Sequence, residues 1–457
     1  MELSSLRSRI RGTVTLPTDS GYEHLRRSLV WHLQVPERRP RAIVRVADVE
    51  DVIETVRFAR ANRLKLAIRG GGHSWVAFSL RDDTLLIDLD RLDRVTIDAK
   101  AQRAAIQPAV SGRELNRLLN AQGLAFPVGH CPTVPMSGFI LNGGLGWNFN
   151  AWGPACFSVE EAKVVTADGE LVAASAARNS DLLWAIRGGG PGFFGVIVEY
   201  SLKLYPAPGA IVSSNYFYPL ERAQSVGAWA SELARKLPRH VELTVLITAA
   251  PPAIADRCRS ARGLAMLVSA TAFCAGASEA ALTLSALESC PAANACLLKE
   301  PNVATPIDAL LDMGGMAWPE RHNFLADTLW TDSSLGEVLA SARDRFLAAP
   351  STKSLLVAVP STGARSPLPD GAYSLNGEAL LLCYAIWDDA SHAANAQWHR
   401  ATIAALDRFA IGHYVGESDI VADPRRAERC YSPAAWKRLG ELRRKYDPDG
   451  RFVGHFA

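Results

Sequence analysis

The stretch "AIRGGGHSW", residues 67–75, places His73 directly after three glycines at the end of an apolar run. Glycine is used where the chain needs a positive φ or where a ligand lies against bare backbone. Phosphate binding would account for the glycines but not for an imidazole beside them. A lone histidine is more often a satisfied surface or core group, so a chemical role for His73 requires a reactive partner elsewhere in the chain.

A candidate partner lies in "GHCPTVPMSGFILNGGLGW", residues 129–147, where Cys131 stands between a histidine and a proline in a glycine-rich loop. Further glycine clusters occur at residues 143–146 and 187–195. None of the clusters has the lysine of a phosphate-binding P-loop, and none opens a βαβ unit with an acidic residue about twenty positions on. These absences disfavour a P-loop and a nicotinamide site, whereas several glycine clusters in one region indicate an extended ligand with phosphates.

Composition limits the class of protein. A chain of 457 residues predicts two domains, and 49 basic against 47 acidic side chains leave a net charge of +2 without a long basic run. Nucleic acid and anionic membranes are therefore not expected as partners. The N-terminal residues carry scattered charges and no later segment is apolar over the width of a bilayer, so we expect a cytoplasmic protein. The eight cysteines form no CxxC pair, which favours free thiols and predicts no metal site.

The elements that must position His73 and Cys131 lie in residues 1–207, where short β-rich runs alternate with helical stretches. Residues 162–174 contain Asp168-Gly169 between two β-rich runs, which predicts a hairpin. The other predicted strands are residues 42–47, 65–70, 84–89, 94–99 and 193–206, and the predicted helices are residues 49–64 and 111–123.

Beyond residue 207 the pattern changes. Strands are predicted at residues 211–220, 241–249, 264–273, 354–361 and 379–387, with helical segments such as 222–237 and 278–288 between them. This alternation predicts an antiparallel sheet covered by helices. A helix ended by Asp447-Pro448 closes the chain. The sequence thus predicts an α+β protein with divisions at 1–207, 208–410 and 411–457.

Five segments together resemble one family: "IRGGGHSW", "GHCPTV…GFILNGGLGW", "VEEAKVVTADGEL", "DLLWAIRGGGPGFFGVIVEYSLKLYP" and "KYDPDGRF". They are similar to the berberine-bridge-enzyme-like oxidases of the vanillyl-alcohol-oxidase flavoprotein superfamily. The resemblance runs from about residue 40 to 207 and returns near the C-terminus. It implies a two-part FAD-binding domain of the PCMH type in 1–207, a substrate-binding domain in 208–410, and a segment returning to the FAD domain in 411–457.

The resemblance also implies that two side chains bond the same FAD, His73 at the 8α-methyl carbon of the ring and Cys131 at its C6. A thiolate and a neutral imidazole are nucleophiles suited to attack on an electrophilic ring. Two tethers would restrain the ring and raise its redox potential. The other cofactor contacts that the resemblance implies are Arg69, Gly70, Gly71, Gly72, Ser74, Gly129, Thr133, Val134, Gly138, Asn142, Gly143, Gly144, Gly146, Trp147, Gly195, Val196 and Ile197.

The implied reaction oxidises a small molecule, an alcohol, sugar or amine-containing secondary metabolite, by hydride transfer to flavin N5. A small residue at Val134 favours O2 as acceptor, which would give H2O2. A base must take the proton of the substrate. Tyr414 is the first candidate because it occupies the family's Tyr-x-Asn segment, although Gly416 replaces the asparagine. Tyr384 is the second candidate, and both tyrosines could instead only pack.

Three positions depart from the family pattern. Leu145, Phe139 and Leu382 stand where relatives often carry an aromatic residue, a histidine and a glutamine or glutamate. An apolar Phe139 would disfavour negative charge on the reduced ring. Two alternatives therefore stay open: a dehydrogenase that passes electrons to another acceptor, and a non-catalytic binder that retains flavin. The sequence assigns no oligomeric state.

Overall fold

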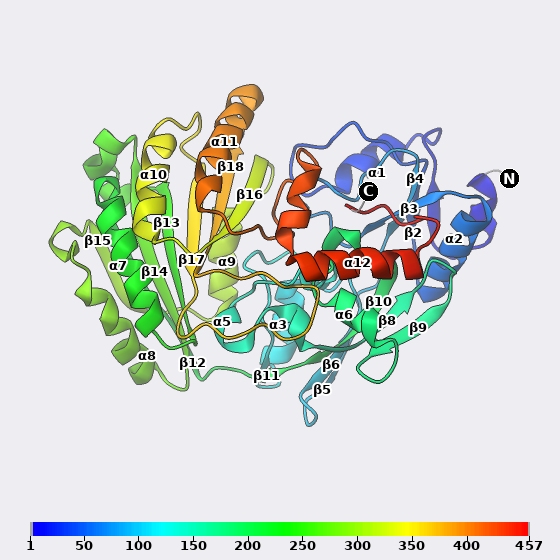
Figure 1. Ribbon diagram of the computed structural model, residues 1–457, viewed down its shortest axis with the longest axis horizontal. Helices are drawn as coiled ribbons and strands as arrows, with labels where there is room; N and C mark the ends of the chain where they lie inside the picture. Colours follow the sequence, from blue (N-terminus) through cyan, green and yellow to red (C-terminus); the bar gives the residue numbers. More distant parts are fainter. Residues whose placement is uncertain (1–2, 456–457) are drawn as a thin grey trace.

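The computed structural model describes residues 3–455, so the outermost residues of the predicted divisions 1–207 and 411–457 lie outside it. Its strands form a four-stranded, a five-stranded and a seven-stranded sheet, together with a separate short pair. Figure 1 shows the seven-stranded sheet with its helices on the left and the smaller sheets on the right. Helices alternate with a small parallel sheet and pack on larger antiparallel ones, which confirms the α+β prediction.

The four-stranded sheet carries the loop of His73 and has the order β1-β2-β4-β3, with β2, β4 and β3 parallel. Helix α2 connects β2 to β3, and the Asp48 carboxylate accepts the Asp51 N–H at 3.1 Å to cap its first turn. The buried side chains of Val52 and Val56 pack α2 against the sheet. The bounds are Thr13–Thr15 for β1, Ala42–Arg45 for β2, Lys65–Arg69 for β3, Thr84–Asp88 for β4 and Val49–Ala61 for α2.

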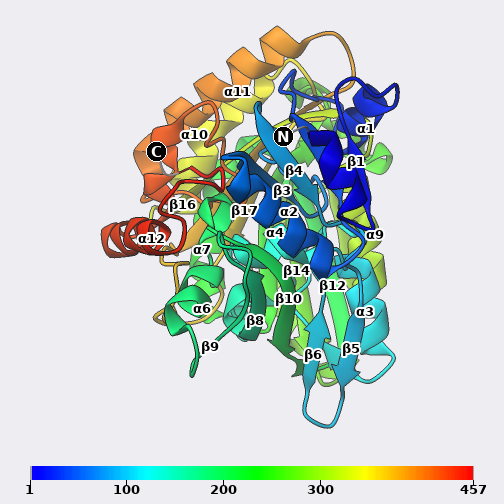
Figure 2. The same ribbon diagram turned by 90° about the vertical axis from the view of Figure 1, so that its right-hand side faces the viewer.

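The five-stranded sheet is antiparallel, in the order β5-β6-β10-β8-β9. Gly169 takes a φ of +75° in the turn between β8 and β9, as the predicted hairpin requires. Figure 2 shows this sheet below the four-stranded one. The bounds are Val95–Asp98 for β5, Arg103–Ile106 for β6, Val159–Val165 for β8, Leu171–Ser175 for β9 and Val196–Lys203 for β10, while Leu124–Ala125 (β7) pairs with Tyr205–Pro206 (β11).

All neighbours in the seven-stranded sheet are antiparallel, in the order β15-β12-β14-β13-β17-β18-β16. The five predicted strands form its centre, and the two edge strands, β15 and β16, were not predicted. The bounds are Ala210–Pro219 for β12, Val241–Ala249 for β13, Leu264–Cys274 for β14, Leu298–Ala304 for β15, Asn323–Thr331 for β16, Leu355–Pro360 for β17 and Ala379–Trp387 for β18.

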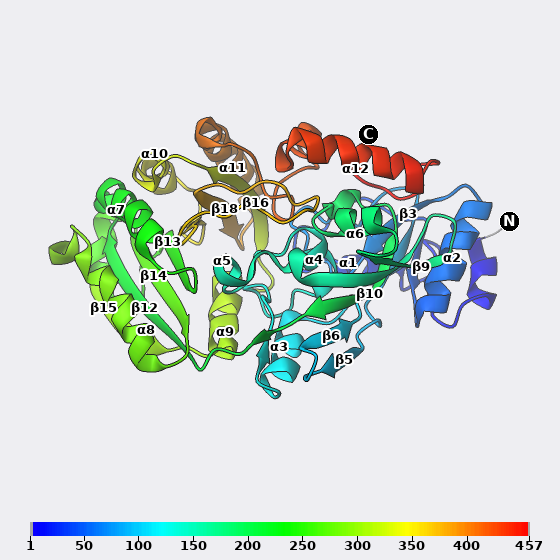
Figure 3. The same ribbon diagram turned by 60° about the horizontal axis from the view of Figure 1, so that its bottom comes forward.

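Helices cover one face of this sheet (Figures 1 and 3), and side chains of the other face line a cavity. Val241, Leu243 and Val245 of β13 face the helices and belong to the buried core there, while the residues between them point to the opposite side. The covering helices are Ala223–Lys236 (α7), Ala277–Leu284 (α8), Leu335–Leu347 (α10) and His392–Leu406 (α11).

Helix α9, Ile307–Ala317, lies between the seven-stranded sheet and helix α3 (Figure 3). Arg113 of α3 pairs with Asp312 of α9 at 2.5 Å, and Asn116 donates to Asp308 at 3.3 Å. These contacts join the two parts of the molecule beside the loop of Cys131. The remaining helices are Tyr22–Ser28 (α1), Gly112–Asn120 (α3), Met136–Leu141 (α4), Phe149–Trp152 (α5) and Ser180–Ile186 (α6). Within residues 3–455 no helix has an apolar stretch long enough to cross a bilayer.

The C-terminal segment touches both parts of the molecule. Gly412 forms a bridge to Trp330 of β16, and Phe452 pairs in parallel with Leu66 of β3. Between them runs α12, Pro433–Tyr446, whose first turn is capped by the Ser432 hydroxyl. The segment therefore borders the seven-stranded sheet before it reaches the sheet that carries His73.

Candidate cofactor and active site

A cavity of about 660 Å³ lies between the glycine-rich loops and the inner face of the seven-stranded sheet. Its volume falls within the range of about 300–1,000 Å³ that ligand sites usually have. Most residues of the sequence-derived site line it. They are Arg69, Gly70, Gly71, Gly72, His73, Ser74, Gly129, Cys131, Val134, Gly138, Asn142, Trp147, Gly195, Ile197, Tyr384 and Tyr414.

His73 follows a loop that only glycine can form. Gly72 has a φ of +75°, and a Cβ there would lie 2.0 Å from the Leu29 carbonyl oxygen; a Cβ on Gly70 would lie 1.7 Å from the Ser137 hydroxyl. The Trp31 ring stacks on the His73 imidazole with centroids 5.0 Å apart. Burial lowers the pKa of His73 to about 4. The ring is therefore neutral at neutral pH and keeps a lone pair for bond formation.

Cys131 is joined to His73 through one hydroxyl. Thr133 Oγ1 lies 3.1 Å from His73 Nε2 and 3.7 Å from Cys131 Sγ. Burial raises the pKa of the Cys131 thiol, and hydrogen bonds from Thr133 act in the opposite direction. Burial thus favours the protonated thiol over the thiolate expected from the sequence. The two predicted nucleophiles nevertheless meet in one cavity.

Five predicted cofactor contacts do not line the cavity: Thr133, Gly143, Gly144, Gly146 and Val196. The glycines allow close packing behind its wall. A Cβ on Gly143 would lie 2.6 Å from the Tyr373 ring, and one on Gly146 would lie 2.3 Å from the Pro127 carbonyl oxygen. Gly144 instead donates its backbone N–H to the Tyr414 hydroxyl at 3.3 Å.

Tyr414, the first candidate base, is buried in this wall. Its hydroxyl accepts the Gly144 N–H, and its ring meets the Tyr373 ring edge-on at 6.4 Å. Burial raises the pKa of Tyr414. A Cβ at Gly416 would lie 2.8 Å from two atoms of the Tyr414 ring, so the ring in this position requires glycine at 416.

Tyr384, the second candidate, has a carboxylate partner that the sequence did not indicate. Its hydroxyl donates a short hydrogen bond to Glu417 Oε2, and Trp75 Nε1 donates to the same oxygen at 3.2 Å. The remaining exposed surface of Glu417 faces the cavity, and burial raises the pKa of its carboxyl group. Burial and the adjacent Glu417 hold the pKa of Tyr384 well above its ordinary value. Tyr384 of β18 and Glu417 thus form a hydrogen-bonded pair whose side chains both line the cavity.

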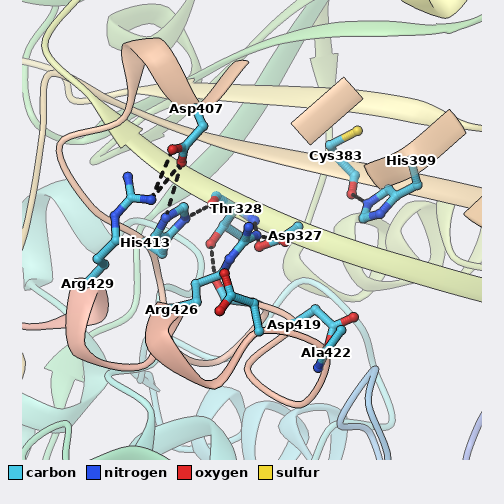
Figure 4. Close-up of polar contacts among 12 residues, drawn as sticks. Asp327, Thr328, Cys383, His399, Asp407, His413, Asp419, Ala422, Arg426 and Arg429 are labelled. Carbon is cyan, nitrogen blue, oxygen red and sulfur yellow. Dashed lines mark hydrogen bonds and ion pairs between the residues drawn. The ribbon is translucent and has the colours of Figure 1, made fainter. Parts of the chain in front are cut away.

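The segment that carries Tyr414 and Glu417 is anchored on β16 (Figure 4). Thr328 Oγ1 accepts the Tyr414 N–H at 2.9 Å and lies 2.8 Å from the Ser418 hydroxyl. The Thr328 carbonyl oxygen lies 2.5 Å from His413 Nδ1. Because both ends of the turn bind one strand residue, Glu417 is held over the neighbouring strand β18.

Ion pairs fix the continuation of this segment (Figure 4). Arg426 pairs with Asp327 of β16, and Arg429 pairs with Asp407 at 3.0 Å. Asp327 is buried, so its pairing with Arg426 compensates a charge that would otherwise be costly inside the protein.

Comparison with known proteins agrees with this geometry. A family model described as an FAD binding domain matches residues 40–175. The FAD-linked oxidoreductase penO of Penicillium crustosum is 29% identical over 447 residues, covering 96% of this chain and 95% of that protein. The chain is an FAD-linked oxidoreductase. The (R)-6-hydroxynicotine oxidase of Paenarthrobacter nicotinovorans is 26% identical to this oxidoreductase over 472 residues, covering 97% of this chain and 95% of that protein.

Solved structures confirm the fold of this FAD-linked oxidoreductase. The 6-hydroxy-D-nicotine oxidase of Arthrobacter nicotinovorans superposes with a TM-score of 0.83 at 22% identity, covering 98% of this chain and 97% of that one. The berberine-bridge-enzyme-like protein 28 of Arabidopsis thaliana superposes with a TM-score of 0.83 at 19% identity, covering 97% of both chains. The fold is that of the PCMH-type, berberine-bridge-enzyme-like flavoproteins.

The positions where the oxidoreductase departs from the family pattern lie in the same cavity. Phe139, Leu145 and Leu382 all line it. Leu382 of β18 provides no polar group to the cavity. Tyr384, two residues farther along the same face of β18, does so together with its hydrogen-bond partner Glu417. None of the eight cysteines takes part in a disulfide among the described residues. Outside the cavity, ligand atoms of His240, Cys274 and Glu279 lie within 4.8 Å of one another, a grouping that the sequence spacing did not indicate.

Proposed function

We propose that this oxidoreductase holds FAD through covalent bonds to His73 and Cys131 and oxidises an alcohol, sugar or amine-containing secondary metabolite, with O2 as the acceptor and H2O2 as the product. The convergence of His73 and Cys131 on one cavity, joined through the Thr133 hydroxyl, carries this proposal. When bound, FAD supplies a ring that accepts a hydride from the substrate carbon and passes the electrons to O2.

The cavity fits FAD on several counts. Its wall contains the glycine loop before His73, where backbone N–H groups are accessible to a phosphate. The imidazole is neutral and the thiol is buried beside it, so both side chains can reach a ring in the cavity without charge repulsion between them. Arg69, at the end of β3, lines the same side of the cavity, where its guanidinium is held by Asp88 at 2.7 Å and by the Leu29 carbonyl oxygen at 2.9 Å.

For the proton step, we assign Tyr384 and Glu417 as the group that accepts the hydroxyl or amine proton of the substrate. The short hydrogen bond lets Tyr384 pass its own hydroxyl proton to the Glu417 carboxylate as the phenol oxygen takes the proton of the substrate, and the raised pKa of Glu417 suits it to hold that proton. Tyr414 takes the role of a positioning residue, because its hydroxyl is bound to the Gly144 N–H in the wall.

The division of the chain follows from these roles. Residues 1–207 hold the cofactor, residues 208–410 hold the substrate, and residues 411–457 bring Glu417 to the site before returning to the cofactor part. Val134 lies in the cavity wall, where a small side chain leaves space for O2. The seven cysteines other than Cys131 form no disulfide among the described residues, which suits a reducing compartment and supports a cytoplasmic location.

Mass spectrometry of the acid-precipitated protein tests the covalent attachment. The expected result is a yellow pellet whose chain carries the mass of one FAD, and His73→Ala and Cys131→Ser should each retain a single bond. A colourless pellet and an unmodified mass would overturn the attachment. A peroxide-coupled screen of alcohols, sugars and amines then tests turnover, and a flavin that substrates reduce but air reoxidises slowly would indicate a dehydrogenase instead.

A further inference from the structure

The inner face of the seven-stranded sheet is divided into a polar and an apolar half. Two rows of polar side chains cross neighbouring strands in register, and all of them line the cavity. The first row is Glu242, Thr271 and Ser213, and the second row is Thr244, Ser269, Asn215 and Glu300. We call these seven residues the polar half. The adjacent row, which includes Leu246, Val357 and Leu382, is apolar and leads along β17 and β18 toward Tyr384.

Glu242 is the buried charge of the polar half. Its side chain is 3% exposed. One carboxylate oxygen lies 2.8 Å from His130 Nε2, and the other accepts the Asn148 N–H at 3.2 Å. A carboxylate has about four lone-pair sites, so further donors can still bind to it. Because a histidine is charged only when protonated, Glu242 has no permanent positive partner among the described ion pairs.

The charges of the cavity wall are unbalanced. Three carboxylates line it on the substrate side: Glu242, Glu300 and Glu417. Among the described lining residues, Arg69 is the one lysine or arginine, and it is engaged by Asp88 at 2.7 Å and by the Leu29 carbonyl oxygen at 2.9 Å. An uncompensated buried carboxylate is costly, and a cation from the ligand relieves that cost. Carboxylate substrates, by the same argument, are repelled.

An aromatic ring lies on the other side of the His130 imidazole from this charge. Trp147 packs against that imidazole with centroids 4.2 Å apart, and both Trp147 and Glu242 line the cavity. A tryptophan ring and a carboxylate in one cavity favour an ammonium group, because the ring quadrupole and the negative charge both attract it. The Trp147 ring and the Glu242 carboxylate would both attract a neutral or an acidic group less than an ammonium group.

We propose that the substrate is an amphipathic amine whose protonated amino group, remote from the reacting carbon, binds at Glu242 in the polar half. Its apolar body lies over Leu246, Val357 and Leu382, which places its other end at Tyr384 and Glu417. The assignment of the reacting end rests on the proposed function. The binding of a cation at Glu242 does not, since it follows from the charges of the wall alone.

Calorimetric titration of the holoenzyme with two ligands of equal shape tests this site without turnover. The probes are benzyltrimethylammonium and its uncharged carbon isostere, neopentylbenzene. We expect the cation to bind at least tenfold more tightly than the isostere, and Glu242→Gln to remove that preference while the affinity for neopentylbenzene stays the same. Glu279→Gln, an exposed position of α8 outside the cavity, is the matched control and should leave both affinities unchanged.

Equal affinities for the two probes in the parent enzyme would overturn the proposal, as would an unaltered preference in Glu242→Gln. If Glu242→Gln fails to fold, Glu242→Asp provides the second measurement. This variant keeps the charge, so it should retain the preference for the cation. Thr244→Val, which leaves Glu242 in place, should retain that preference as well. An enzyme that binds the cation but oxidises none of the alcohols, sugars and amines would contradict the proposed function and leave the cation site standing.

Discussion

Tyr384 of β18 donates a hydrogen bond to Glu417, a residue of the C-terminal segment, and both line the cavity that His73 and Cys131 share. The partners are brought together by tertiary structure alone, because Thr328 holds the turn of Glu417 on the neighbouring strand. A buried carboxyl group paired with a phenol in a ligand cavity is an arrangement typical of acid–base sites.

Replacement of Glu417 by glutamine removes the final proton acceptor and keeps the shape of the side chain. We expect kcat to fall by about 10²–10⁴-fold, the usual contribution of a positioned base. Stopped-flow measurement of flavin bleaching under anaerobic conditions isolates this step from reoxidation. An effect smaller than about tenfold would show that Glu417 does not act in proton transfer.

The pH profile follows from the direction of the Glu417 shift. The base must be a carboxylate, so activity falls as the pH decreases through its pKa, and burial raises that pKa above the ordinary value of a glutamate. The acid limb of kcat/KM should therefore lie above the range of an exposed glutamate. In Glu417→Gln that limb should disappear from the profile. A limb that persists unchanged would assign the titration to another group.

The two tyrosines of the cavity give a matched comparison. Tyr384→Phe breaks the hydrogen bond to Glu417 and should lower kcat by a factor close to that of Glu417→Gln, since the two groups act as one unit. Tyr414→Phe removes an acceptor for the Gly144 N–H and should lower kcat by less than about tenfold, the worth of one neutral hydrogen bond. Reversed sizes of these effects would make Tyr414 the base.

Sequence reasoning predicted many of the residues that line one cavity, including the glycine loop before His73, because the signals of the glycine-rich loops are local. The glycines before His73 and around Cys131 are needed by the backbone itself, and Gly72 shows why, with its positive φ against Leu29. Glu417 carries no such signal. It stands in "YVGES", where Tyr414 is the more conspicuous residue, and its role depends on contacts with Tyr384 and Trp75 that are distant in sequence.

The edge strands of the large sheet escaped prediction for a related reason. β15 contains Lys299, Glu300 and Pro301 and is exposed along most of its length, a composition that suits an edge but not a core strand. β16 interrupts its apolar pattern with Asp327 and Thr328. Thr328 binds Ser418 and Asp327 pairs with Arg426, both residues of the C-terminal segment (Figure 4). The polar residues that interrupt the apolar pattern of β16 are therefore those that anchor this segment.

Thr133 connects the two predicted attachment points, and its hydroxyl can be tested separately from them. Thr133→Val keeps the shape but loses the contacts to His73 and Cys131, so both side chains lose an orienting partner. We expect a lower fraction of doubly attached FAD, measured by intact mass after limited reconstitution of protein made with little flavin. Thr133→Ser retains the hydroxyl and should restore the parent value, whereas equal attachment in all three proteins would exclude an orienting role.

We expect position 416 to require glycine because a larger residue would strike the Tyr414 ring, and not because Gly416 takes part in the reaction. A Cβ at this position would lie 2.8 Å from two ring atoms, so Gly416→Ala forces the buried ring to move, and overpacking of this kind costs about 1–3 kcal/mol in the free energy of unfolding. Gly440→Ala on α12 is the matched control, because a Cβ there would meet the flexible end of Arg444 at 3.7 Å and alanine favours a helix by about 0.5–1 kcal/mol. Chemical denaturation should therefore show a loss of unfolding free energy for the first variant and none for the second.

Combining Gly416→Ala with Tyr414→Leu removes the ring that the new Cβ would strike, so the double variant should lose less stability than the sum of the losses of the two single variants. Additive losses would mean that the two residues do not constrain each other.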